Sequence, residues 1–367
     1  MYSKGIGNTV MKRKVIDGHM HLARWEGNDG RNVFEELLEY EERSGISAVD
    51  NMCSTNNGDL WDGFEADQSI LGAIAKLENP TVFTHGCLYL PKDYTDFKGF
   101  DFKDQLDELM GIGLDGIKIC DFKPDAYKLF KVDKHLYEYD DFIGYCEKNS
   151  VHMCWHVADP KDFWDPDNAS EVSKAKGWFY GDGTYPSYET LMDMTYNFLD
   201  EHPKLNVLLA HMFFKSFDPD EMVALLEKYP NVCIDMAPGW EMFSGFFAYH
   251  DKWEQIFKKY STRFLYATDR TIPGDIDYLC ASAHHVLRFL ETDDEFDVNY
   301  GHRTKGIRLE GDELDNVLYK NHERTVGQRP REIDKTALKK YIQKYLPLLE
   351  DSRNKQFAEE YYRKNLI

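Results

Sequence analysis

Short apolar, β-branched runs recur along the chain, and each is followed by a stretch with apolar residues at helical spacing. Eight such runs predict strands at 15–22, 46–53, 81–90, 114–120, 151–157, 206–211, 231–237 and 263–269. The predicted helices lie at 34–43, 67–77, 102–110, 136–148, 188–201, 219–229, 252–260 and 276–290. Two further helical stretches, near 313–325 and 335–363, complete the pattern.

Regular alternation of strand and helix indicates parallel strands joined by crossover helices. Eight is the number of strands that closes a β/α barrel. The competing architecture, an open doubly wound sheet, would carry a glycine-rich phosphate turn after its first strand, and the segment 17–21 has no such turn. We therefore predict an α/β fold, a (β/α)8 TIM barrel forming a single domain over 1–367. The barrel would span about 14–327, with a C-terminal helical extension over about 328–367.

Residues at the carboxyl ends of barrel strands face a common mouth. His19 and His21 stand two apart on the first strand, so both point to the same face, about 6.5–7 Å apart along the strand. Four more polar residues lie near other strand ends: Lys118 on the fourth, His156 on the fifth, His211 on the sixth and Asp269 on the eighth. Imidazoles with a carboxylate suit zinc, manganese, iron or nickel, so the pattern predicts a metal site. The remaining histidines that we weighed, 85, 152, 250, 284 and 285, are expected to be structural or surface residues.

The same positions carry a resemblance to a known family. The matching segments are 17–21, 116–118, 155–157, 209–211 and 267–269, together with 319–324 near the end. In their order and spacing they resemble the amidohydrolase superfamily, and within it the amidohydrolase-related branch of metal-dependent hydrolases and decarboxylases. The likeness spans about residues 14–327.

The resemblance implies one divalent ion, with zinc as first choice and manganese, iron or nickel as alternatives. Its ligands would be His19, His21, His156 and Asp269. His211 would be a ligand or a group that orients water or substrate. Lys118 would hold a second ion if its amine is carboxylated. We favour substrate binding for Lys118, because a buried lysine needs an anionic partner.

The expected reaction is hydrolysis of an amide, lactone or ester of a small organic substrate. A divalent ion makes water reactive near neutral pH, Asp269 would carry its proton, and His211 would polarise the substrate carbonyl. The same residues also suit non-oxidative decarboxylation of a small aromatic or unsaturated acid. Lys118 tilts the interpretation toward hydrolysis. A non-catalytic barrel that binds a metal or ligand is a third alternative.

The segment 158–187 is long for a loop and rich in Asp, Gly, Pro and aromatic residues. Because it follows His156, we interpret it as an aromatic lid over the substrate, with a contact between subunits of a homo-oligomer as the alternative. Trp178 in this insertion, Trp240 after the seventh strand and Arg270 are candidates for substrate binding. Arg270 would grip a carboxylate through its fork, although strand alternation favours a direction away from the mouth.

Composition limits the partners. The formal charge of −21 excludes nucleic acid and anionic membranes, which would be repelled. No apolar run approaches the roughly 18 residues of a membrane span, and residues 1–13 lack the apolar core of a signal peptide. Seven scattered cysteines without a CxxC pair indicate reduced core residues. We therefore expect a cytoplasmic protein that acts on a small molecule.

Overall fold

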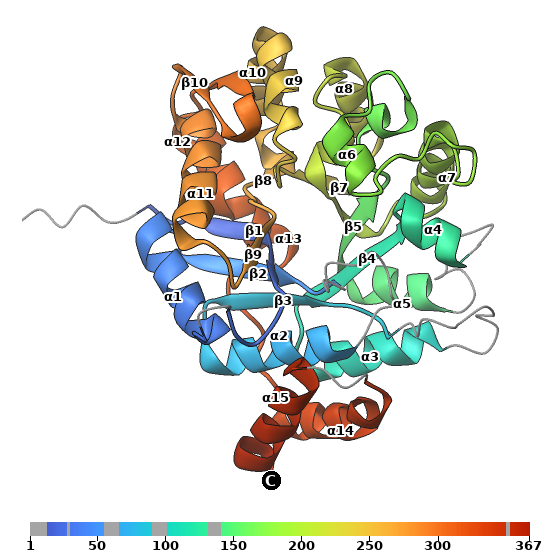
Figure 1. The fold of residues 1–367 in the computed structure, drawn as a ribbon, viewed down its shortest axis with the longest axis vertical. Helices are drawn as coiled ribbons and strands as arrows, with labels where there is room; N and C mark the ends of the chain where they lie inside the picture. Colours follow the sequence, from blue (N-terminus) through green and yellow to red (C-terminus); the bar gives the residue numbers. More distant parts are fainter. Residues whose placement is uncertain (1–12, 28–29, 55–65, 90–100, 131–140, 350–352) are drawn as a thin grey trace, which may run out of the picture.

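A computed structural model describes residues 13–27, 30–54, 66–89, 101–130, 141–349 and 353–367. Within them, parallel strands form one curled sheet in the order β8-β7-β6-β5-β4-β3-β2-β1-β9 (Figure 1). The strands are β1 (Ile16–Leu22), β2 (Ala48–Met52), β3 (Val82–Gly86), β4 (Gly116–Phe122), β5 (His152–Val157), β6 (Asn206–Leu209), β7 (Val232–Asp235), β8 (Phe264–Leu265) and β9 (Arg270–Ile272). Each lies within or beside a predicted strand, and the predicted TIM barrel is confirmed.

The two outermost strands of this sheet are consecutive in sequence, and together they close the barrel. β8 pairs with β7 through Phe264 and Ile234, whereas β9 pairs with β1 through Arg270 and Met20. The predicted single strand over 263–269 is therefore wrong in detail, because it is broken between β8 and β9. The cause is Asp17, whose carboxylate accepts hydrogen bonds from the amide and the hydroxyl of Thr268 at 3.0 and 2.7 Å and draws that residue out of the ladder.

β1 carries an irregularity that decides which way its side chains face. Its pairing register with β2 shifts between Asp17 and Met20. The Asp17 carboxylate binds the hydroxyl of Tyr40 on α1 (Val33–Ser44) at 2.8 Å, outside the barrel. His19 instead contacts Asp235 at the end of β7, and His21 contacts Asp269 just before β9. In a regular strand Asp17, His19 and His21 would all face the same side. The bulge therefore separates them, so that both histidines face inward and Asp17 faces outward.

Helices cover the outside of the sheet, as the periodicity predicts (Figure 1). They include α2 (Ala66–Glu78), α3 (Phe102–Ile112), α5 (Phe142–Asn149), α7 (Tyr188–Glu201), α8 (Pro219–Lys228), α10 (His250–Lys259) and α11 (Ile276–Glu291). The side chain of Asp218 accepts a hydrogen bond from the amide of Glu221 and caps α8, and Asp275 caps α11 in the same way. The first part of the helix predicted over 136–148 falls outside the described residues.

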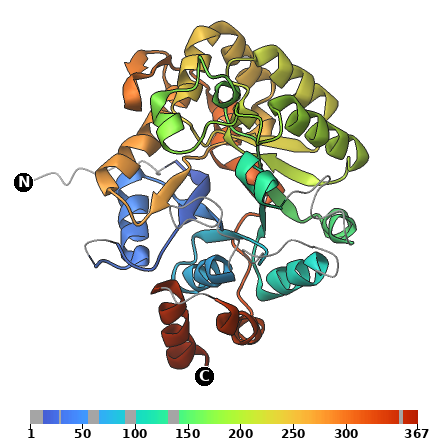
Figure 2. The ribbon, with the colours of Figure 1, turned by 45° about the vertical axis from the view of Figure 1, so that its right-hand side comes forward.

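Several elements are additions to the eight-fold pattern: α4 (Pro124–Phe130), α6 (Glu171–Ala175), α9 (Glu241–Ala248) and the antiparallel hairpin of β10 (Glu295–Asp297) and β11 (Arg303–Lys305). The stretch predicted near 313–325 is helical, through α12 (Gly311–Asp315), a π-helical turn and α13 (Asn321–Thr325). The predicted C-terminal helix consists of α14 (Lys335–Tyr345) and α15 (Arg353–Tyr361), with Pro347 between them. Both lie beneath α2 and α3, and Figure 2 shows them at the same end after rotation.

The barrel interior is packed in layers. Ile16, Ala48 and Phe83 form one buried cluster, and a second contains Met52, Cys154, Leu208, Ala210, Cys233 and Leu265. All seven cysteines are buried and none of them forms a disulfide, as expected for reduced core residues. No helix in the described part of the chain has the length and apolarity that a membrane span requires.

Candidate metal centre

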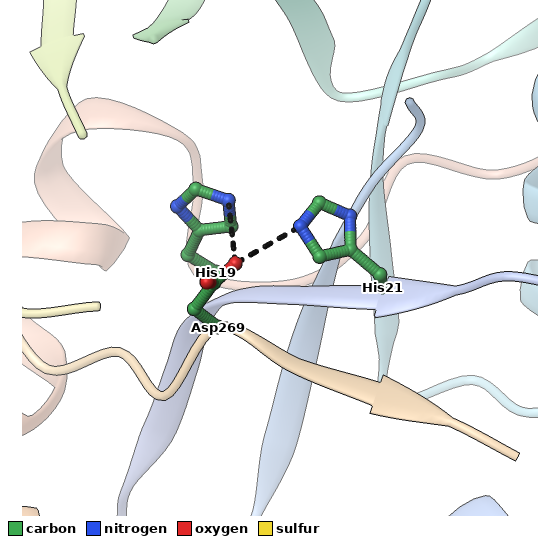
Figure 3. Close-up of side chains that lie close together, drawn as sticks. All are labelled: His19, His21 and Asp269. Atoms are coloured by element: carbon green, nitrogen blue, oxygen red, sulfur yellow. Dashed lines mark hydrogen bonds and ion pairs between the residues drawn. The ribbon is translucent and has the colours of Figure 1, made fainter. Parts of the chain in front are cut away.

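Three predicted ligands converge at the end of β1. The Nε2 atom of His21 lies 3.1 Å from Oδ1 of Asp269, and Nε2 of His19 lies 3.8 Å from the same oxygen. Figure 3 shows both rings turned toward this carboxylate. One ligand atom from each of the three residues lies within 4.8 Å of the other two, so the set is able to hold one metal ion.

The other ring nitrogens of these histidines are held from behind. Nδ1 of His19 lies 2.7 Å from Oδ2 of Asp235, and Nδ1 of His21 lies 2.6 Å from the carbonyl oxygen of Met52. Both partners are acceptors, so each Nδ1 carries the hydrogen and each Nε2 is left with a lone pair. Support of this kind fixes the tautomer in which histidine binds metals. Because Nε2 of His21 then faces a carboxylate oxygen, a proton or a cation must lie between them.

His211 and His156 form the second half of the cluster. Nδ1 of His211 lies 3.1 Å from the carbonyl oxygen of Ala237, and Nε2 of His156 lies 3.1 Å from that of Ala158. Their remaining nitrogens face each other at 3.1 Å. The centre of the His211 ring lies 5.1 Å from that of His19. The His156 ring packs on the His211 ring, with 4.6 Å between their centres. His156 and His211 therefore stand beside the convergent trio and outside it.

Burial and neighbouring charges set the protonation of these groups. Burial and the ammonium of Lys118 lower the pKa of His19 well below its usual value, and burial with His211 does the same for the pKa of His156. Burial alone would raise the pKa of Asp269, but the surrounding histidines, His211 above all, hold that pKa well below its usual range. Neutral imidazoles and an ionised carboxylate are the forms that bind metals.

Sequence reasoning missed Asp235, which organises the centre from beneath. This fully buried carboxylate at the end of β7 binds His19 and also accepts hydrogen bonds from the amides of His211 at 2.8 Å and Ala237 at 3.1 Å. His211 has a φ of 58°, a conformation that persists in non-glycine residues only where surrounding contacts impose it. The available signal was an acidic residue at the end of an apolar strand run.

Lys118 lies at the floor of the same centre. Its ammonium donates to Nε2 of His19 at 3.2 Å and lies 3.5 Å from Sγ of Cys154. The side chain is almost completely buried on β4. His19, Cys154 and Asp235 also make up a second group of potential ligand atoms within 4.8 Å of one another. Lys118 is therefore placed to interact with whatever occupies the centre.

Arg270 and Trp240 lie together beside Asp269. Nη1 of Arg270 donates to the hydroxyl of Tyr278 at 2.8 Å, and Nε1 of Trp240 donates to the same oxygen at 3.1 Å. The guanidinium carbon lies 5.3 Å from the centre of the Trp240 ring. Arg270 thus contacts α11 through Tyr278 and the loop after β7 through Pro238. Asp269, with a φ of 52°, interrupts the strand just before Arg270, so simple alternation does not set the direction of this side chain.

Trp178 lies within the insertion. Its ring stacks on Phe163 at 6.1 Å, and the ammonium of Lys176 lies 4.6 Å from its centre. The contacts that define its position therefore come from the insertion itself. They do not link Trp178 to the convergent trio.

A second buried polar cluster lies nearer the amino ends of the strands. Oδ1 of Asp50 lies 2.8 Å from Nδ1 of His85, and Oδ2 lies 2.8 Å from Nε2 of His322. Nε2 of His85 in turn lies 2.6 Å from Nδ1 of His152. These side chains fill the interior below the metal centre. His322 belongs to the segment 319–324 that resembles the family's closing motif, and here it contributes to packing inside the barrel.

Comparison with known proteins yields likeness in structure alone. No family model matches the chain. No curated protein matches it either.

Solved crystal structures of low sequence identity share its fold, and three of them are described next. An uncharacterised TIM-barrel protein from Bordetella bronchiseptica has a TM-score of 0.54 at 15% identity, covering 86% of this chain and 99% of its own. A provisionally named amidohydrolase from Staphylococcus aureus has 0.51 at 16% identity, covering 86% and 100%. The 5-carboxyvanillate decarboxylase LigW from Sphingomonas paucimobilis has 0.50 at 14% identity, covering 85% and 98%. The chain thus shares its TIM-barrel fold with proteins named as an amidohydrolase and a decarboxylase, and this is the fold that the motif resemblance implies.

Proposed function

We propose that the chain is a metal-dependent enzyme that hydrolyses an amide, lactone or ester bond of a small organic substrate, with one zinc ion as its first-choice cofactor. The observation that carries the proposal is the convergence of His19, His21 and Asp269, whose two imidazoles are each supported from behind by an acceptor. Three protein ligands with an open position are typical of catalytic zinc. Manganese, iron and nickel are alternatives with the same donor set.

Asp269 is the proton carrier in this proposal. A bound divalent ion supplies a Lewis acid and a water whose pKa falls toward about 7. The Asp269 side chain is 31% exposed, so it reaches both the ion ligands and the open mouth. It takes the proton of the attacking water and later delivers it to the leaving group.

His211 has two roles that depend on its protonation. Since Nδ1 faces the Ala237 carbonyl, Nε2 donates a hydrogen bond only when the ring is an imidazolium. In that form His211 polarises the substrate carbonyl. As a neutral ring it serves as a further ligand together with His156, which is our fourth proposed ligand.

The proposed substrate site lies next to Asp269, and four residues are its candidate contacts. Arg270 and Trp240 support a planar or anionic group, because they present a guanidinium and an indole next to each other. Lys118, whose ammonium now contacts Nε2 of His19, would bind the substrate once that nitrogen holds the ion, or would help to hold a second ion if its amine were carboxylated. Trp178 has less support, since its contacts lie within the insertion.

Non-oxidative decarboxylation of a small aromatic or unsaturated acid is the second candidate. The observation that favours it is Arg270, which stands directly beside Asp269 and suits a carboxylate. The decarboxylase from Sphingomonas paucimobilis also shares the fold. In this reaction Asp269 would deliver a proton to carbon. A non-catalytic metal-binding barrel would show neither activity.

The test combines metal analysis with a substrate panel. Purified protein should contain one equivalent of divalent metal and should turn over members of a panel of aryl esters, lactones, amides and unsaturated carboxylic acids. Asp269→Asn should abolish turnover, and Asp251→Asn, an exposed control on α10, should not. Full activity in Asp269→Asn would refute the proton-transfer role. Protein without any bound divalent metal would refute the proposed function.

A further inference from the structure

Among the contacts that join the insertion 158–187 to the barrel, those of Asp159 are made by a buried carboxylate. Only 5% of this residue is exposed. Its oxygens lie 2.8 and 2.9 Å from the ammonium of Lys123, just after β4. Its Oδ2 accepts a hydrogen bond from the hydroxyl of Tyr180 at 2.7 Å, and its Oδ1 lies 3.4 Å from Nε2 of His156. One side chain thus contacts the barrel, the far part of the insertion and a proposed metal ligand.

Tyr180 anchors the body of the insertion at this point. It is 1% exposed, and its ring packs against Trp164 and Tyr185, each with a centre-to-centre distance of 4.9 Å. The indole of Trp164 donates to the carbonyl of Pro186 at 2.8 Å. Burial and the Asp159 carboxylate raise the pKa of Tyr180 well above its usual value, so its hydroxyl remains a donor. Tyr180 therefore links the aromatic cluster to Asp159 through one hydrogen bond, whereas Trp164 and Tyr185 contact α7 and α4.

The same carboxylate constrains the ring of His156. Nε2 faces two acceptors, the carbonyl of Ala158 at 3.1 Å and the carboxylate of Asp159. Nε2 must therefore carry the hydrogen, and Nδ1 is left with a lone pair on the side of His211. Partners that hold the outer nitrogen of a histidine set its orientation and its strength as a ligand.

We propose that Asp159 is a positioning residue that couples closure of the insertion to ion binding at His156. Tyr180 fastens the insertion to Asp159, and Asp159 in turn holds the His156 ring with Nδ1 toward the centre. This inference rests on the proposed function, because it takes His156 as a ligand. Coupling between two sites is reciprocal, so an ion at the centre must also stabilise the insertion.

Ion affinity is the first readout. Zn²⁺ affinity, measured by competition with a chromophoric chelator, should fall about fivefold in Tyr180→Phe, which removes one hydrogen bond. It should fall about 10–100-fold in Asp159→Asn, which weakens the support of the ring. Tyr185→Phe is the matched control, because its hydroxyl binds Asp125 instead of Asp159. The affinity of this control should stay within about twofold of the parent.

Hydrogen exchange of the insertion is the second readout. Zn²⁺ should slow amide exchange over 158–187 in the parent protein and in Tyr185→Phe, and much less in Asp159→Asn. In a His156→Ala background, Tyr180→Phe should have no further effect on Zn²⁺ affinity, because the path from Tyr180 to the ion is already broken.

The outcomes separate the inference from the proposed function. If the parent binds no divalent ion, the proposed function fails. If it binds one ion, but Tyr180→Phe retains full affinity and Zn²⁺ leaves exchange of the insertion unchanged, the coupling is refuted and the function stands. Should Asp159→Asn not fold, because Lys123 loses its partner, Tyr180→Phe and the His156→Ala cycle decide the question.

Discussion

Asp235→Asn is the most direct test of how the metal centre is built. The substitution keeps the shape of the side chain and its oxygen, which continues to accept from the amides of His211 and Ala237. It places an amide NH2 group where a carboxylate oxygen now lies 2.7 Å from Nδ1 of His19. Two donors would then face each other, and the His19 ring must move its hydrogen to Nε2.

The magnitude follows from this change. A hydrogen bond to a charged group contributes about 1.5–3 kcal/mol. Moving the hydrogen to Nε2 also removes the lone pair that points toward Asp269. We expect Zn²⁺ affinity to fall about 10–100-fold, which corresponds to about 1.4–2.8 kcal/mol. The two figures agree in size, so loss of this one hydrogen bond accounts for the expected effect.

The assay is chelator competition with Zn²⁺, together with a thermal melt of the metal-free protein. The control is Asp121→Asn, a buried position on β4 whose carboxylate accepts from the indole of Trp155 at 3.1 Å. An amide oxygen also accepts this bond, so ion affinity should not change there. Parent-like Zn²⁺ affinity in Asp235→Asn would refute the argument that Asp235 fixes the tautomer of His19.

Three further predictions concern the substrate, the pH response and the ion. Arg270→Lys should raise KM for an anionic substrate about tenfold with a smaller change in kcat, since lysine cannot form the same fork, and steady-state kinetics measures both. Burial raises the pKa of Asp17 from 3.8 to about 6, so the folded state binds more protons between these values and stability is lost as pH rises through this window. Asp17→Asn should therefore remove up to about 3 kcal/mol of the decline in unfolding free energy between pH 4 and 6, measured by urea titration. Chelation should lower the melting temperature by several degrees and abolish turnover, with both restored by Zn²⁺.

The elements that sequence could predict are those fixed by burial. Helix α7 begins and ends at the predicted residues 188 and 201, because an apolar stripe and the Ser187 cap define it locally. His19, His21 and Asp269 were found because strand ends of a barrel share one mouth. The antiparallel hairpin was not predicted from the sequence. Three-residue strands such as β10 bury a single side chain, Phe296, and are too short to show an alternation of apolar and polar residues.

Contacts that arise only when strands meet could not be predicted. Nothing local to Asp235 indicates that it would bind His19, 216 positions away. The side-chain direction of Arg270 follows from the positive φ of Asp269, which depends in turn on Thr268 and Asp17 across the barrel closure. Such features need the closed barrel, because their partners come from strands far apart in sequence.

The charges around the centre balance before an ion binds. The carboxylates of Asp235, Asp269 and Asp159 are matched by the ammonium groups of Lys118 and Lys123 and by the guanidinium of Arg270. Uncompensated charge is costly in a buried site. A divalent ion would add two positive charges, and an anionic substrate group would offset part of them. The count therefore favours a substrate that carries a negative charge.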